Sequence, residues 1–216
     1  MHQCLGVILE PTQNLKDVLA PHVRSEENQN GFMDYYYVGN KWANSLRLKP
    51  GGKEIYLEGP ISDHIISEAH LVEVLLGGYR VNCEEGYADM AKIRDIDFDP
   101  DPKIVELYDP VWETLVHGAP LSSAMQDEVP WLCYDPECAK LLLDTFGDKE
   151  CFLTHQSCFP FEYVLTPDGI FHEQDVDCFD CQGLTICYDK SGTFTERLKE
   201  FLSPNNVLAV VDYHIS

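Results

Sequence analysis

Asp212 and His214 are the residues of this chain whose types and spacing best suit proton transfer. They lie two positions apart in a run of strand-forming residues, so a strand there would place the carboxylate and the imidazole on one face. A carboxylate that orients a histidine is the usual arrangement for acid–base catalysis and for metal binding. Three residues from other segments complete this candidate site: Asp34, Lys41 and His172. No nucleophile elbow, phosphate-binding loop or His-Glu-x-x-His motif accompanies them, so Asp212 and His214 are weak catalytic candidates beside the alternative of solvated or structurally satisfied residues.

The segment from Asp34 to Leu46 combines aromatic residues, a turn and one cation. Three consecutive tyrosines at 35–37 place rings on both faces of an extended strand. The Gly-Asn pair at 39–40 tolerates positive φ and would turn the chain, which brings Lys41 and Trp42 back beside the tyrosines. The pattern predicts a ring-lined pocket for a small anionic ligand, with Trp42 largely buried, or else an aromatic hairpin packed into a core. The predicted ligand-binding residues are Asp34, Tyr36, Lys41, Trp42 and His172.

This segment resembles the Trp-Asp-Trp-Tyr-x-x-Gly-Gly-Arg-Trp motif of a family of uncharacterised phage and bacterial proteins. The matching positions are Asp34, Tyr36, Gly39 and Trp42, and the differing ones are Tyr35, Asn40 and Lys41. Lys41 stands where the family has arginine, and a lysine cannot make the bidentate contact of a guanidinium. Three further segments are similar to the family's first helix, closing hairpin and last strand: Leu15–Pro21, Thr166–Glu173 and Val210–Ile215. The resemblance implies a fold and a phage setting, without an established activity.

The chain is strongly acidic, with 37 Asp and Glu against 15 Lys and Arg, a net charge of -22 and a pI near 4.5. Such a charge repels nucleic-acid and lipid phosphates, so direct nucleic-acid binding and membrane binding are not expected. It favours a host protein with a basic surface as partner, or serves solubility alone. No apolar run reaches the ~20 residues of a membrane span, and the first residues do not resemble a signal peptide, so we expect a cytoplasmic protein.

The densest acidic run is the predicted partner-binding segment, and it consists of Asp95, Asp97, Asp99 and Asp101. Its alternating carboxylates have the spacing of a calcium loop, with Glu106 at the twelfth position. Pro100 occupies the sixth position, where the sharp turn of an EF-hand requires glycine. An EF-hand is therefore excluded, and a single divalent-cation site stays an open alternative.

Nine cysteines occur in a chain that we expect in the cytoplasm, which favours reduced thiols or metal ligands over disulfides. One Cys-x-x-Cys pair is present, Cys178 and Cys181. With His172, or with His155 and Cys158, this pair has the ligand types of a zinc site. Redox chemistry at the pair is a weaker alternative, because the neighbouring Asp177 and Asp180 disfavour a thiolate.

The order of the expected elements predicts an α+β fold, with a mixed or mostly antiparallel sheet of four to six strands and helices mainly on one face. Strands are predicted at residues 3–9, 35–37, 54–57, 184–188 and 207–214, and a Pro-Asp-Gly hairpin at 161–173. Helices are predicted at 62–76, 109–118, 135–147 and 193–202, and a short helix is predicted that Thr12 or Asn14 caps and that ends before Pro21. We expect one domain over residues 1–216, with a helical insertion at about 60–147.

Two functional hypotheses follow, the first from the charge together with the phage setting that the resemblance implies, and the second from the candidate catalytic residues. The first is a phage-type acidic binding protein that occupies or inhibits a host component, such as a defence protein, through its acidic surface or the aromatic pocket. The second is a small hydrolase or nucleotide-processing enzyme that uses Asp212 and His214, with or without a divalent metal. No cofactor is firmly implied, and zinc is the candidate metal.

Overall fold

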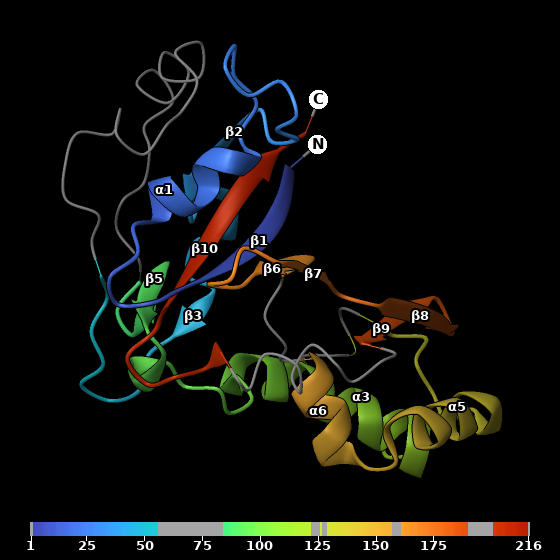
Figure 1. Cartoon of the computed structure of the whole chain (residues 1–216). Helices are drawn as coiled ribbons and strands as arrows, with labels where there is room; N and C mark the ends of the chain where they lie inside the picture. Colours follow the sequence, from blue (N-terminus) through green and yellow to red (C-terminus); the bar gives the residue numbers. More distant parts are fainter. Residues whose placement is uncertain are drawn as a thin grey trace. The chain divides into compact units, whose positions relative to one another are not determined.

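A computed structural model describes residues 2–55, 84–121, 126, 129–156, 161–189 and 201–215 (Figure 1). The chain divides into two compact units. Unit 1 comprises Met1–Asp97, Phe159–Gln174 and Thr193–Ser216, and unit 2 comprises Phe98–Cys158 and Asp175–Gly192. The predicted α+β class is confirmed, because helices and a mixed, mostly antiparallel sheet of six strands are both present.

Unit 1 is built on the six-stranded sheet, in which two long strands, β1 (His2–Leu9) and β10 (Val207–His214), pair antiparallel along their whole length. The order across the sheet is β2-β10-β1-β6-β7, and β5 also pairs with β10. The four shorter strands are β2 (Tyr35–Val38), β5 (Met90–Lys92), β6 (Tyr163–Leu165) and β7 (Phe171–Glu173). Among the described strands of this sheet, β1 and β6 are the one parallel pair. The strand order places the predicted first and last strands, β1 and β10, inside the sheet.

The two faces of this sheet bury different side chains, because successive strand residues point to opposite sides. On one face, which we call the α1 face, Leu5, Tyr36 and Tyr213 pack with Leu15 and Leu19 of the short helix α1 (Leu15–Leu19). Of the two predicted cap residues, Thr12 and Asn14, it is Asn14 that caps α1, by accepting a hydrogen bond from the backbone N–H of Lys16. On the other face, which we call the opposite face, buried residues of β1, β6 and β10 pack with Phe161 and Leu46: Cys4, Ile8, Val164, Leu208 and Val210.

The described residues of unit 1 also form several short elements. Strands β3 (Leu46–Arg47) and β4 (Tyr87–Ala88) form a small antiparallel pair. The 3-10 turns are η1 (Ala20–His22), η2 (Asn40–Trp42) and η4 (Ile93–Asp95). The predicted Pro-Asp-Gly hairpin is confirmed between β6 and β7, with Gly169 at a φ of 82°.

Unit 2 contains three helices among its described residues, α3 (Pro102–His117), α5 (Pro136–Phe146) and α6 (Lys149–Gln156), and a hairpin of β8 (Val176–Cys181) and β9 (Leu184–Asp189). Its core is a separate cluster in which Trp112, Leu142 and Phe152 are fully or nearly fully buried. Lys149 forms ion pairs of 2.8 Å with both Asp109 and Glu113 of α3, which tie α6 to that helix.

Several predicted boundaries change. Helix α3 starts at Pro102 and not at 109, because the Asp101 side chain caps it and Pro110 is accommodated inside the helix. The Asp135 cap and the end of α5 at Gly147 are confirmed, whereas β8 and α6 were not predicted. The predicted helix at 62–76 and most of that at 193–202 lie outside the described residues, as do residues 56–57 of the strand at 54–57.

Candidate functional site

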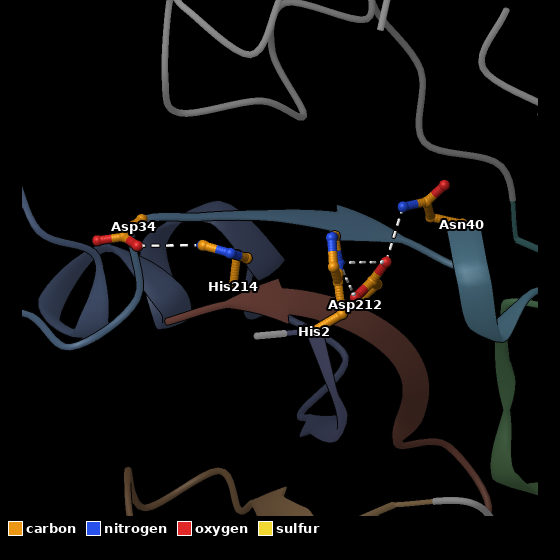
Figure 2. A network of polar contacts seen from close by, with 5 residues as sticks. All are labelled: His2, Asp34, Asn40, Asp212 and His214. Carbon is orange, nitrogen blue, oxygen red and sulfur yellow. Dashed lines mark hydrogen bonds and ion pairs between the residues drawn. The ribbon is translucent and has the colours of Figure 1, made fainter. Parts of the chain in front are cut away.

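Asp212 is a fully buried carboxylate on the opposite face of the sheet, near the end of β10. Its two oxygens lie 3.0 and 3.2 Å from Nδ1 of His2, in the first residue of β1. The side-chain amide of Asn40, which follows β2, donates a hydrogen bond of 2.7 Å to Oδ2 of Asp212 (Figure 2). Both oxygens of this buried charge are therefore satisfied by side chains from two other segments.

A second histidine–carboxylate pair lies next to the first. Nδ1 of His214 is 3.1 Å from Oδ2 of Asp34, and the ring of Tyr35 stacks on the His214 imidazole with a centroid separation of 4.8 Å and an interplanar angle of 6°. Arg24 contacts the other oxygen of Asp34 at 3.6 Å. The His2 and His214 ring centroids are 5.3 Å apart, so two imidazoles, each held at Nδ1 by a carboxylate, stand side by side (Figure 2).

Strand pairing explains how distant residues form this site. In the β1–β10 register His2 lies opposite His214, and in the β10–β2 register His214 lies opposite Tyr35. Residues at every second position share a face, which adds Asp212 to the same group. Asp34 and Asn40 come from the two ends of β2, where the chain enters and leaves the sheet.

The turn after β2 depends on Gly39. Its φ is 71°, and a Cβ atom there would lie 2.0 Å from Oδ2 of Asp89, so only glycine fits this position. Asp89 is itself held in place, since its Oδ1 accepts a hydrogen bond from the backbone N–H of Asn44. Asn40 follows with a φ of 50°, which confirms the predicted Gly-Asn turn and brings its amide to Asp212.

The hydrogen bonds fix which imidazole nitrogen is presented outward. An ionised carboxylate only accepts hydrogen bonds, so Nδ1 of His2 and of His214 carries the proton and donates it. Nε2 is then the basic nitrogen of each neutral ring. The His2 side chain is 40% exposed and that of His214 26%, so the pair is open to solvent while Asp212 is not. Burial and the Asp212 charge raise the pKa of the neighbouring Cys4 thiol, which stays neutral beneath the site.

The structure brings together three of the predicted site residues, Asp34, Asp212 and His214, and separates the others. Tyr36 packs in the α1 face and is 1% exposed, and burial raises its pKa to about 12. Trp42 packs against the opposite face and is only partly buried. The predicted pocket that combines these two rings is therefore wrong, because strand alternation puts Tyr36 on the α1 face.

Lys41 and His172 also lie in other surroundings. The Lys41 ammonium lies 5.0 Å from the Trp42 ring centroid, a cation–π contact. Nε2 of His172 lies 3.2 Å from the Thr166 hydroxyl at the β6–β7 turn. Lys41 therefore contacts Trp42, and His172 contacts Thr166, in place of the predicted common site.

The acidic run at 95–101 makes several local interactions. Asp97 forms an ion pair of 2.9 Å with Arg47, and Asp101 caps α3 by accepting a hydrogen bond from the backbone N–H of Lys103. Asp95 lies at the end of η4. Asp99 lies between Asp97 and Asp101 in the sequence. Partner binding by this run stays a prediction, and at least three of its four carboxylates make contacts within the fold, since Asp95 also lies 4.0 Å from Nε of Arg94.

Two cysteines of unit 2 differ from the prediction of reduced thiols, whereas Cys133, Cys138, Cys151 and Cys181 are free. Cys178 and Cys187 face each other across the β8–β9 hairpin and form a disulfide. Cys178 therefore offers no thiolate to zinc, contrary to the predicted ligand set with Cys181 and His172. Cys181 is buried, and its thiol contacts that of Cys138. Within the described ranges, no group of three or more His, Cys, Asp or Glu residues is arranged to hold a metal ion.

His2 and Asn40 were missed by sequence reasoning. The sequence identifies His2 as a site residue only if the first and last strands are known to pair, because that pairing places His2 opposite His214. Asn40 was predicted as a turn residue, and its second role at Asp212 depends on the path of the chain after β2.

In the part of the chain that the structure describes, no helix is long and apolar enough to cross a membrane. Comparison of the chain with protein-family models, curated proteins and solved structures finds no match.

Proposed function

We propose that the His2–Asp212 and His214–Asp34 pairs form the acid–base centre of a small hydrolase or nucleotide-processing enzyme. The observation that carries this proposal is the buried Asp212, which is bound to an exposed histidine at 3.0 Å. A buried carboxylate is costly unless its partners satisfy it. Here it also holds an imidazole in the tautomer that a general base needs.

Hydrolysis needs two proton transfers, and the site has two imidazoles. One neutral ring accepts a proton at Nε2 from the attacking water, and the other, when protonated, returns a proton to the leaving group. Asp212 and Asp34 stabilise the imidazolium that forms on the ring beside each of them. Because His2 is the more exposed of the two rings, we assign to it the role of the base that accepts a proton from water. His214 is then the acid that donates a proton to the leaving group.

The test of this function is a hydrolysis screen with purified protein, before and after dialysis against a chelator. The panel contains 4-nitrophenyl acetate, 4-nitrophenyl phosphate, bis(4-nitrophenyl) phosphate and nucleotides followed by phosphorus NMR. His2→Gln should reduce the rate on the active substrate by about 10²–10⁴-fold, the contribution of one general acid or base. His172→Gln is the matched control, because its ring contacts Thr166 and not the site.

Equal rates for His2→Gln and the wild type would remove His2 from the mechanism. Recovery of activity in the dialysed protein only after addition of Zn²⁺ or Mg²⁺ would show that the reaction needs a divalent metal. If neither form of the protein turns over any substrate of the panel, the hydrolase proposal is rejected in favour of binding.

A second candidate function is the acidic binding protein, and the distribution of charge favours it. Unit 2 has 79 residues, of which 16 are Asp or Glu and 4 are Lys or Arg, a net charge of -12 out of the -22 of the chain. More than half of the excess negative charge therefore lies on little more than a third of the residues. We propose that unit 2, and not the run at 95–101 alone, would contact a basic partner such as a host protein of the phage setting.

This second candidate is tested by capture from host lysate at two salt concentrations, because electrostatic association weakens as the Debye length falls from about 10 Å at 0.1 M to about 3 Å at 1 M salt. The test variant neutralises three exposed carboxylates of unit 2: Glu137→Gln, Asp144→Asn and Glu150→Gln. The control makes the same change in charge on unit 1: Glu10→Gln, Glu26→Gln and Glu27→Gln. Capture that is indifferent to salt, or weakened equally by both variants, contradicts a basic partner on unit 2.

A further inference from the structure

The ring of Trp131 in unit 2 is exposed to solvent and is nevertheless held in one place. The residue is 56% exposed, although its indole N–H donates a hydrogen bond of 2.9 Å to the backbone carbonyl of Gln182 in the β8–β9 turn. The N–H is the one hydrogen-bonding group of an indole, and here it is bonded within the protein. Trp131 can therefore offer a partner only its aromatic face.

Gln182 fixes the segment that carries this ring. Its side-chain N–H donates to the backbone carbonyl of Cys133 at 2.9 Å, and its side-chain oxygen accepts from the backbone N–H of Cys133 at 3.2 Å. Gln182 and Gly183 have φ values of 56° and 84°, the pair of positive angles that a tight two-residue hairpin turn requires. Three hydrogen bonds thus join residues 131–133 to a rigid turn, and a ring that is fixed in advance loses little freedom on binding.

Carboxylates come from the turn and from the helix that follows the 131–133 segment. Asp180 is exposed in the turn, where its Oδ1 accepts a hydrogen bond from the backbone N–H of Gly183. Asp135 caps α5, and Glu137 is exposed in the first turn of that helix. Burial raises the pKa of the Cys181 thiol, and the charges of Asp180 and Asp135 raise it further, so both carboxylates lie near the end of β8. Together with the net charge of -12 on unit 2, they favour a cation beside the exposed ring.

Arginine is the cation that suits an aromatic face among carboxylates. Its planar guanidinium stacks on aromatic rings and pairs with carboxylates, whereas the compact ammonium of lysine is more strongly hydrated. Trp and Arg are also the residues that most often dominate the energy of protein–protein binding. We propose that Trp131 and the carboxylate of Asp180 bind an arginine side chain of a basic partner protein. This inference rests on the second candidate function, the acidic binding protein, and assigns the residue that anchors its contact with unit 2.

Two peptides of equal charge and different cation test the proposal on the full chain: acetylated and amidated hexa-arginine and hexalysine. The chain has 3 tryptophans, whose indole N–H signals are followed separately in proton–nitrogen NMR spectra, and Trp131→Leu assigns the signal of Trp131. At about 0.1 M salt, hexa-arginine should shift the Trp131 signal and leave those of Trp42 and Trp112 unchanged. It should also bind about twofold or more tightly than hexalysine in calorimetry.

Three variants separate the aromatic face from the charge. Trp131→Leu keeps every charge and should bind hexa-arginine about two- to fivefold more weakly, the effect of one exposed cation–π contact, while hexalysine changes less. Gln182→Asn tolerates the positive φ but is one methylene too short to hold Cys133, so it should also weaken hexa-arginine. Phe98→Leu is the matched control, because it removes another ring of unit 2 that is 42% exposed, and it should leave the affinity unchanged.

Several results would overturn this site, and they differ from those that reject the second candidate function. Equal affinity of the wild type and Trp131→Leu for hexa-arginine, an equal loss in Phe98→Leu, or an unshifted Trp131 signal at saturation would each show that charge alone binds the peptide. The titration of the wild type stands even if a variant does not fold. The acidic binding protein would survive these results if capture from lysate is still weakened by salt and by neutralisation of unit 2. Capture that is indifferent to salt rejects the binding protein itself, whatever the peptides show.

Discussion

Replacing Asp212 by asparagine tests whether the buried carboxylate holds the site together. The carboxylate accepts hydrogen bonds from Nδ1 of His2 and from the amide of Asn40. An asparagine has one oxygen for these two donors, and its own N–H group faces the other donor. Hydrogen bonds to charged groups contribute about 1.5–3 kcal/mol and a buried unpaired donor costs about 1–3 kcal/mol, so we expect Asp212→Asn to lower the free energy of unfolding by about 2–4 kcal/mol.

The assay is urea unfolding followed by circular dichroism, with Asp34→Asn as the matched control. Asp34 also contacts a histidine at Nδ1, but its side chain is 23% exposed, so the loss there should be about 0–1 kcal/mol. Equal losses of unfolding free energy in the two variants would show that the burial of Asp212 does not increase its contribution to stability. An Asp212→Asn variant with wild-type stability would refute the reasoning, because the carboxylate would then be no better satisfied than an amide.

Three further predictions concern other parts of the chain. Gly39→Ala should lower the unfolding free energy by more than about 1 kcal/mol, because the new Cβ would meet Asp89 at a positive φ; a wild-type melting temperature contradicts this. Reduction of the Cys178–Cys187 disulfide, which closes a short loop with a sequence separation of 9, should cost about 2–3 kcal/mol of stability, and a Cys187→Ala variant should then lose all sensitivity to reductant in calorimetry. Burial lowers the pKa of His155 below its ordinary value of 6.5, so the unfolded chain binds the proton more readily and stability should fall as pH drops from 7.5 to 5.5. In urea titrations, the unfolding free energy of His155→Gln should fall less than that of the wild type between pH 7.5 and 5.5. An equal fall in the two proteins would show that His155 is not the cause.

Much of the fold could be predicted because its signals are local. Consecutive residues specify three of its elements, and each forms as predicted: the strands at 3–9 and 207–214 and the turn at Pro167–Gly169. The start of α3 was missed because Asp101-Pro102 and Asp109-Pro110 are both cap-like pairs, and the chain uses the earlier one. The disulfide depends on a β8–β9 register that places Cys178 opposite Cys187, which cysteine spacing alone does not determine.

The candidate site could be predicted only in part because it depends on pairing between distant strands. Asp212 and His214 share a face by simple alternation, so their neighbourhood needed no tertiary information. His2 joins them only through the antiparallel pairing of the first and last strands. The same alternation sends Tyr36 to the α1 face, where the predicted pocket cannot form.

The tautomers of His2 and His214 test the central claim most directly, because they need no knowledge of the substrate. Long-range proton–nitrogen NMR spectra of the full chain at neutral pH distinguish an imidazole protonated at Nδ1 from one protonated at Nε2, and His2→Gln and His214→Gln assign the signals. The account predicts that both neutral rings carry the proton at Nδ1, directed at Asp212 and Asp34, and present a basic Nε2. Protonation of neutral His2 at Nε2, or rapid exchange between both tautomers as in a free imidazole, would contradict the acid–base site.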